Sequence, residues 1–214
     1  MKILVTLPKD DNFDRFFPLK LIRRLEAVGE VFWNPSSRQL SVTELTDALA
    51  DTEVCLTGWH VPRLDHDLLQ RADRLRLVAH LGGTVAPVAS ESLYGRGVRV
   101  CSGNSVMAKV VAEAILGYFL CGLRNVVHFD RSLHDGPGWS REIERCRSLF
   151  GGTVGFVGLG TVGRALLDLL RPFGVTVLVY DPYLDRTALE PVSYTHLTLP
   201  TTLNSCRSRW SPYH

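Results

Sequence analysis

The chain lacks the features of a secreted, membrane-bound or nucleic-acid-binding protein. Its five cysteines are odd in number and widely spaced, with no C-x-x-C pair, which excludes a disulfide framework and predicts reduced structural thiols. A net charge of +2 gives no reason to expect nucleic acid. The N-terminus has no signal-peptide pattern, and no apolar run reaches the length of a membrane-spanning helix. We therefore expect a cytoplasmic protein that binds neither nucleic acid nor a membrane.

The spacing of the histidines gives no indication of a metal site. Five of them show neither metal-ligand spacing nor a nearby pair of carboxylates, so we assign them to the surface or to ordinary hydrogen bonds. They are His60, His66, His80, His128 and His134. The composition, with 45% apolar and 21% charged residues, is that of an ordinary globular protein. A length of 214 residues fits one or two domains.

The strongest pattern covers residues 153–181, TVGFVGLGTVGRALLDLLRPFGVTVLVYD. A short apolar strand opens it, and an apolar helix follows. Three glycines stand between strand and helix at G-x-G-x-x-G spacing: Gly158, Gly160 and Gly163. Residues 175–180 form a second strand, apolar on both faces as in a covered parallel sheet, and this strand ends on Asp181. Strand, glycines, helix, strand and acid stand in the order that dinucleotide binding requires.

Each part of this unit has a physical role in binding a dinucleotide. The first glycine permits a tight turn, the second leaves the backbone open to the pyrophosphate, and the third lets the helix pack closely on the strand. The N–H groups at the start of the helix receive the diphosphate. The acid accepts hydrogen bonds from the adenosine ribose and repels a 2′-phosphate, which favours NAD over NADP. The predicted cofactor-binding residues are Gly158, Gly160, Thr161, Val162, Gly163 and Asp181. The alternative is a βαβ unit without a ligand.

Residues 1–100 alternate short apolar runs with amphipathic segments, which predicts an α/β fold with a parallel sheet and crossover helices. The expected strands begin at Ile3 and at residues 31–33, 54–57, 75–81 and 98–100. The expected helices cover residues 16–28 and, from a capping box at Ser41-Val42-Thr43-Glu44, residues through Ala50. From about Asn104 a single long helix is expected, which links two domains.

These segments resemble the D-isomer-specific 2-hydroxyacid dehydrogenase family over roughly residues 1–190. The resemblance rests on LRLVAHLGGT (residues 75–84), on residues 97–100 and 111–113, on Trp139 and on residues 151–183. It implies a flavodoxin-like substrate domain joined to a doubly wound Rossmann domain, with NAD as cofactor and a small 2-hydroxy or 2-oxo acid as substrate. It also implies a homodimer for the intact family member.

On this basis we expect a substrate domain over residues 1–102 and a linking helix with the first part of the Rossmann domain over residues 103–190. After the fourth strand the family commonly has a glycine loop with an Asp, whereas this chain has Gly83-Thr84-Val85-Ala86-Pro87. Backbone amides there still suit a substrate carboxylate, so Gly83 and Thr84 are candidate substrate residues.

The family's catalytic Arg, acidic residue and His follow in the second half of its Rossmann domain. Here the family pattern fades after Glu190, so we assign no catalytic residue and expect a truncated, inactive chain. A partial domain would also leave Val175, Val177 and Val179 poorly covered. Two functions remain open: an NAD-dependent 2-hydroxyacid oxidoreductase, or a non-catalytic NAD-binding regulatory module of the corepressor type.

The last 24 residues, 191–214, contain no Asp, Glu or Lys and eight Ser or Thr. Within them VSYTHLTLPTT resembles a translated sequencing-adapter remnant, so we interpret this tail as an artefact foreign to the family. The alternative is that HLTLPTT is a displaced copy of a later strand and loop of the family domain, reached through an internal deletion.

Overall fold

A computed structural model describes residues 1–136, 138 and 145–183 of the chain. The chain divides into two compact units, Met1–Met107 and Ala108–His214. The division falls inside helix α5 (Asn104–Leu123), whereas the sequence analysis set the boundary just before this helix. The expected tail at 191–214 lies outside the described residues.

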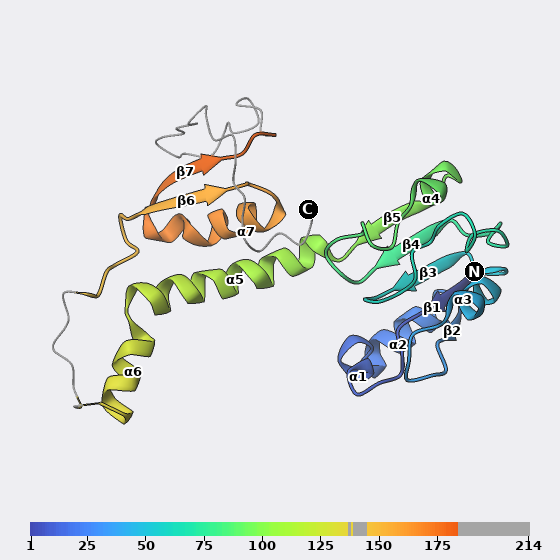
Figure 1. The fold of residues 1–214 in the computed structure, drawn as a ribbon, viewed down its shortest axis with the longest axis horizontal. Helices are drawn as coiled ribbons and strands as arrows, with labels where there is room; N and C mark the ends of the chain where they lie inside the picture. The colour runs from blue at the N-terminus through green and yellow to red at the C-terminus, as the bar shows by residue number, and fades with distance from the viewer. Residues whose placement is uncertain (137, 139–144, 184–214) are drawn as a thin grey trace. The chain divides into compact units, whose positions relative to one another are not determined.

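The first unit is built on a five-stranded parallel sheet (Figure 1). Its strands are β1 (Lys2–Val5), β2 (Glu30–Trp33), β3 (Val54–Thr57), β4 (Leu77–His80) and β5 (Arg99–Ser102). Their spatial order is β2-β1-β3-β4-β5, and each neighbouring pair is parallel. This is the flavodoxin-like order, in which the winding reverses between β1 and β3. The predicted parallel α/β sheet is confirmed.

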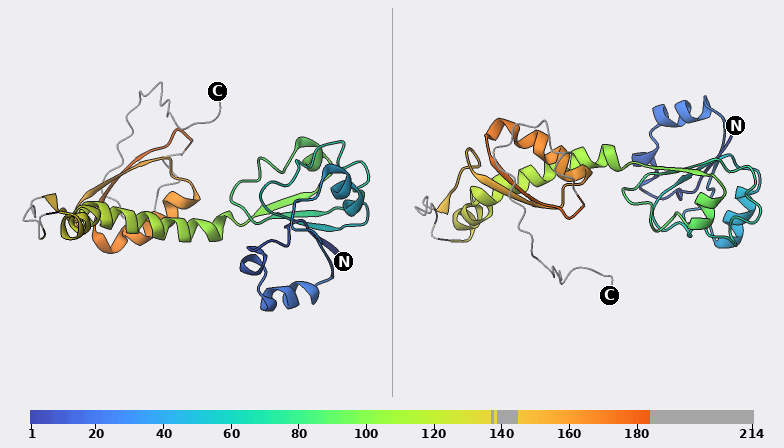
Figure 2. Two further views of the ribbon diagram at one scale, coloured as in Figure 1. Left: turned by 60° about the horizontal axis from the view of Figure 1, so that its bottom comes forward. Right: turned by 90° about the horizontal axis from the view of Figure 1, so that it is seen from above.

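Alternate strand residues face two separate cores in this unit. Register pairs join Leu4 to Cys55, Cys55 to Val78 and Val78 to Val100, and all four contribute to one core. Val5 lies on the opposite face, buried in the second core. Helices α1 (Phe13–Phe16) and α2 (Leu19–Glu26) cover one face, and α3 (Val42–Leu49) and α4 (Glu91–Gly95) cover the other (Figure 2). This period of two is what a sheet covered on both faces requires.

The expected single helix over residues 16–28 is wrong. Two helices, α1 and α2, flank Phe17 and Pro18 instead. Pro18 has φ −61° and ψ 151°, an extended conformation, and a proline ring disfavours the helical conformation of the residue before it. The side chain of Phe17 is buried in the core between sheet and helices, so the break is held by packing.

The expected continuous helix from Asn104 is also wrong, because α5 ends at Leu123 and α6 covers Val126–His134. The break lies at Asn125, whose φ of 51° and ψ of 35° are left-handed. Asparagine tolerates this conformation better than most residues. Gly117 lies within α5 without interrupting it.

Helix α5 also contradicts the expectation that no apolar run reaches the length of a membrane-spanning helix. Its 20 residues are long and apolar enough to cross a membrane by length and composition, contrary to the absence inferred from the sequence. The core helix of a soluble protein passes the same test. One face of α5 packs on the core of the second unit through Ile115, Leu116 and Phe119.

In the second unit, β6 (Thr153–Val157) and β7 (Thr176–Tyr180) form a parallel pair (Figure 1). Helix α7 (Thr161–Leu170) and a short 3-10 turn, Arg171–Phe173, connect them. Val177 and Val179 are 2% and 5% exposed, so the expectation that they are poorly covered is wrong. They share a core with α5 and α7, and the uncovered side of the sheet instead carries Val157, which is 83% exposed.

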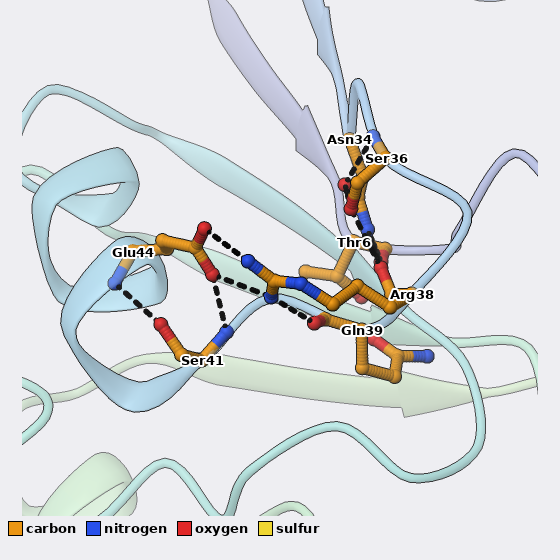
Figure 3. A network of polar contacts seen from close by, with 7 residues as sticks. All are labelled: Thr6, Asn34, Ser36, Arg38, Gln39, Ser41 and Glu44. Atoms are coloured by element: carbon orange, nitrogen blue, oxygen red, sulfur yellow. Dashed lines mark hydrogen bonds and ion pairs between the residues drawn. The ribbon is translucent and has the colours of Figure 1, made fainter.

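The capping box predicted at Ser41 is confirmed at the start of α3 (Figure 3). The Glu44 backbone N–H donates to Ser41 Oγ at 3.3 Å, and the Ser41 N–H donates to Glu44 Oε2 at 2.8 Å. Arg38 also donates to both carboxylate oxygens of Glu44, at 2.8 and 2.7 Å. These bonds, the Arg38 guanidinium first, lower the pKa of Glu44 to about 2. The carboxylate thus joins the chain before α3 to its first turn.

We expect Ser41→Ala to destabilise the first unit by about 1 kcal/mol, the usual cost of losing a serine N-cap. Urea unfolding followed through the NMR signals of the first unit measures this. Ser37→Ala, at an exposed position outside the helix, is the matched control. Equal midpoints for the two variants would contradict the role of the cap.

The stabilising effect of the Glu44 carboxylate should depend on pH. Because its pKa is lower in the folded state than the ordinary 4.5, its contribution is complete above pH 4.5 and is lost as the pH falls toward about 2. Glu44→Gln should therefore be less stable than the parent at pH 7 and equally stable near pH 2. A Glu26→Gln control, at an exposed position, should show no such convergence. A constant difference across this range would exclude the ionised form as the stabilising species.

Candidate functional site

The turn after β6 depends on Gly158. Its φ of 85° lies in the left-handed region, which glycine adopts without the steric cost that a Cβ brings. The Gly158 N–H donates to the carbonyl oxygen of Tyr180 at 2.7 Å, which ties the turn to the end of β7. The chain therefore leaves β6 sharply and enters α7 within three residues.

The two later glycines of the motif differ in their surroundings. A Cβ built on Gly163 would lie 3.2 Å from Leu159 Cδ1 and 3.5 Å from the Gly158 carbonyl oxygen, so the helix approaches the turn closely here. A Cβ on Gly160 would meet nothing within 4 Å among the described residues. Gly160 is also the N-cap residue of α7 and supplies no side chain to cap the first N–H groups, where Thr161 and Val162 begin the helix. Open space beside the backbone and the first N–H groups of α7 are therefore found at the same place, Gly160.

Asp181 stands at the carboxyl end of β7 and reaches back to the glycine turn. Its Oδ2 accepts the Leu159 N–H at 2.7 Å, and its Oδ1 accepts the Tyr183 N–H at 2.9 Å. The Leu159 bond, followed by the Tyr183 bond, lowers the pKa of Asp181. A carboxylate oxygen has more than one lone pair, so each can still accept a hydroxyl donor.

The six predicted cofactor residues lie in the turn after β6, in the first turn of α7 and directly after β7. The turn offers an unobstructed backbone, the start of a helix and an ionised acceptor on the neighbouring strand. This set fits a diphosphate flanked by a ribose, because the helix start favours anions and the carboxylate favours hydroxyl groups. The geometry agrees with the sequence motif at each glycine.

The predicted substrate residues lie in the first unit, in the loop after β4. Gly83 is partly exposed, and a Cβ there would lie 3.6 Å from Asn104 Oδ1. Thr84 is exposed, and its hydroxyl accepts the Ala86 N–H at 3.4 Å. The loop is open at both residues, and Asn104 is a side-chain neighbour that the sequence analysis did not assign.

Sequence reasoning also missed the support beneath this loop. His80 is 6% exposed, its Nδ1 lies 3.0 Å from Thr57 Oγ1, and burial lowers its pKa. A Cβ on Gly82 would lie 2.5 Å from His80 Nε2, so the ring fills the space directly under that glycine. Gly82, two residues after His80, was the available signal in the sequence. Nothing in the neighbouring residues indicates that the His80 ring turns inward.

Comparison with known proteins agrees with these arrangements. A family model described as "D-isomer specific 2-hydroxyacid dehydrogenase, NAD binding domain" matches residues 116–208. The matched stretch runs past Glu190, so the interpretation of HLTLPTT as a segment of the family domain stays open.

Similar proteins carry the same family's activities in their names. The chain is 29% identical over 192 residues to a D-3-phosphoglycerate dehydrogenase of Methanocaldococcus jannaschii, covering 89% of this chain and 34% of that protein. It is 25% identical to a hydroxypyruvate reductase of Thermotoga maritima, covering 76% of this chain and 52% of that protein. The chain therefore spans about a third to a half of these relatives.

Among solved structures, a phosphoglycerate oxidoreductase from Rhizobium etli matches with a TM-score of 0.67 and 26% identity, covering 89% of this chain and 58% of that one. The similarity covers both the five-stranded unit and the glycine turn, because it spans most of the chain. Residues 116–208 thus resemble the NAD-binding domain of the D-isomer specific 2-hydroxyacid dehydrogenase family, and the glycine turn, the acid and the sheet order are consistent with that similarity.

Proposed function

We propose that this chain carries the NAD-binding turn and the substrate domain of an oxidoreductase of the D-2-hydroxyacid dehydrogenase type. The reaction is hydride transfer between NAD(H) and a 2-hydroxy or 2-oxo acid. The observation that carries the proposal is the bond from the Leu159 N–H to Asp181 Oδ2 at 2.7 Å. It fixes an ionised acceptor beside the turn where the cofactor's diphosphate fits.

In this proposal the cofactor supplies the hydride chemistry through its nicotinamide ring. The chain's own residues bind and orient. The backbone at Gly160 and the first turn of α7 receive the diphosphate. Asp181 accepts the hydroxyl hydrogens of the adenosine ribose, and its negative charge opposes a 2′-phosphate.

The loop at Gly83 and Thr84 is proposed to hold the carboxylate of the acid substrate. Support comes from its position at the carboxyl end of β4, the edge at which open α/β sheets bind ligands. The His80 ring beneath Gly82 holds the loop from below.

The family resemblance also motivates proposals about assembly and place. We infer a homodimer in the cytoplasm for the intact protein, with α5 among its contact surfaces. Support for the surface comes from apolar residues that α5 exposes, such as Val110 at 63% and Tyr118 at 75%. Exposed apolar side chains of this size in one helix are typical of interaction surfaces.

The charge on Asp181 should decide between the two dinucleotides. The chain should bind NADH more tightly than NADPH, and Asp181→Asn should reduce that ratio by roughly tenfold, because it removes the like charge that opposes a 2′-phosphate. Nicotinamide fluorescence titration gives both dissociation constants. Since the pKa of Asp181 is lowered, the preference should persist down to the ordinary aspartate value of 3.8.

Asp168→Asn is the matched control for this measurement. Asp168 lies on α7, the helix that follows the glycine turn, where it pairs with Arg171 at 2.7 Å and is 66% exposed. It undergoes the same loss of charge but does not contact the glycine turn's acid. A parent chain that binds NADPH as tightly as NADH, or a control that shifts the ratio equally, would overturn the assignment.

A second test concerns the activity of this chain by itself. The described histidines of the second unit, His128 and His134, lie on α6 rather than on the glycine turn or its strands. We assign none of the family's catalytic Arg, acidic residue and His to this chain. Losing members of such a catalytic group costs several orders of magnitude in rate. We therefore expect this chain to bind NADH without oxidising it in the presence of glyoxylate, pyruvate or hydroxypyruvate. Steady absorbance loss at 340 nm in proportion to protein concentration would contradict this expectation.

A further inference from the structure

The first unit contains a second pocket at a different place from the Gly83 loop. Its volume is about 390 Å³, within the range of small-molecule sites. The lining comes from the segment after β1, from Gln39 and from the turn after β3. These are the carboxyl ends of β1 and β3, the two strands between which the winding of this sheet reverses. Open α/β sheets bind ligands at that switch point.

The floor and one wall of the pocket are apolar. Leu7, 4% exposed, lies at the floor, and a Cβ on Gly58 would come within 3.0 Å of Leu7 Cγ, so the two strand ends meet closely. Phe16 and Trp59 form the wall, with ring centroids 5.5 Å apart. They are 37% and 45% exposed, an unusual state for two large aromatic rings in contact.

Two features at this pocket are not explained by the stability of the fold. His60 has φ 62°, a left-handed conformation that strains a non-glycine residue and that clusters at ligand-binding sites. Gln39 donates its amide N–H to the Trp59 carbonyl oxygen at 2.8 Å, which fixes its orientation. Its own side-chain oxygen is buried and accepts no hydrogen bond within the described part of the chain. A buried group of this kind calls for an explanation, such as a functional role or a bound water.

The charges that line the pocket have both signs. Asp10 and Arg15 both line it, and neither forms an ion pair with another described residue. Their polar contacts are modest: Asp10 Oδ1 accepts the Asn12 N–H at 2.9 Å, and Arg15 Nη1 donates to Asn12 Oδ1 at 3.4 Å. The carboxylate of Asp10 would repel a purely anionic ligand, and the guanidinium of Arg15 would repel a purely cationic one.

From this combination we propose that the pocket binds a zwitterionic α-amino acid with an apolar side chain. The ammonium group lies toward Asp10, the carboxylate toward Arg15, and the side chain on the Phe16–Trp59 wall. Guanidinium and carboxylate groups match in geometry, and aromatic faces attract an ammonium group as well as apolar carbon. This site is formed by residues of the first unit alone and does not require NAD.

Three probes of one size test the proposal: L-phenylalanine, 3-phenylpropanoate and 2-phenylethylamine. Each is titrated into the full chain without NADH, and the Trp59 indole N–H signal, assigned with Trp59→Phe, is followed by NMR. L-phenylalanine should bind at least roughly tenfold more tightly than either singly charged analogue, since each analogue loses one attractive partner. An analogue that binds as tightly, or no saturable shift with L-phenylalanine, overturns the proposal.

Variants assign the two ends of the ligand. Arg15→Gln should weaken L-phenylalanine to the affinity of 2-phenylethylamine, and Asp10→Asn should weaken it to that of 3-phenylpropanoate. Arg23→Gln is the matched control, because Arg23 lies on α2 and does not line the pocket. Retained parent affinity in both pocket variants, or an equal loss in the control, contradicts the charge assignment. Unchanged amide spectra of the first unit away from the pocket confirm that the variants are folded.

Discussion

The second unit depends on one hydrogen bond, from the Leu159 N–H to the carboxylate of Asp181. It acts together with the Gly158 N–H bond to the Tyr180 carbonyl oxygen, and both join the glycine turn to the end of β7. The register pair Val157–Tyr180 puts the two strand ends level, so the acid reaches the turn without distortion. A positive φ at Gly158 and the close approach at Gly163 then let α7 start directly above the strand. The cofactor turn is therefore built mostly from backbone geometry, which explains why glycines rather than reactive side chains define it.

Features whose cause is local were predictable from the sequence. The capping box at Ser41 needs only four consecutive residues, and the glycine turn with its acid needs fewer than thirty, so spacing alone identified both. The strand at Val54–Thr57 was bounded correctly because its apolar run is short and sharply flanked. The break at Pro18 was also a local signal, but the amphipathic period on either side was given more weight than the proline. Asn125 gave a weaker signal, since asparagine only tolerates the left-handed conformation and does not require it.

Features whose cause is distant in the sequence could not be predicted. Val177 and Val179 are buried because α5, which ends more than fifty residues earlier, packs into the same core as α7. Counting the strands of the partial domain cannot reveal that α5 covers these valines. The expectation that they are poorly covered rested on that count. The same limit applies to His80, whose ring turns inward under Gly82 and meets Thr57 from a neighbouring strand. The histidine's role is set by the sheet register, which pairs Thr57 with His80, and not by its neighbours in the chain.

Both units follow one rule of parallel sheets, with different results. Because all strands of a parallel sheet point the same way, their carboxyl ends gather loops from distant parts of the chain at one edge. In the second unit that edge holds the glycine turn and Asp181, which one motif of consecutive residues supplies. In the first unit Asp10, Gln39 and Trp59 come from three separate segments and meet because β1 is the neighbour of both β2 and β3. A linear motif search finds the first kind of site and misses the second. The mixed charge and the exposed aromatic wall become visible as one pocket only after the strand order is known.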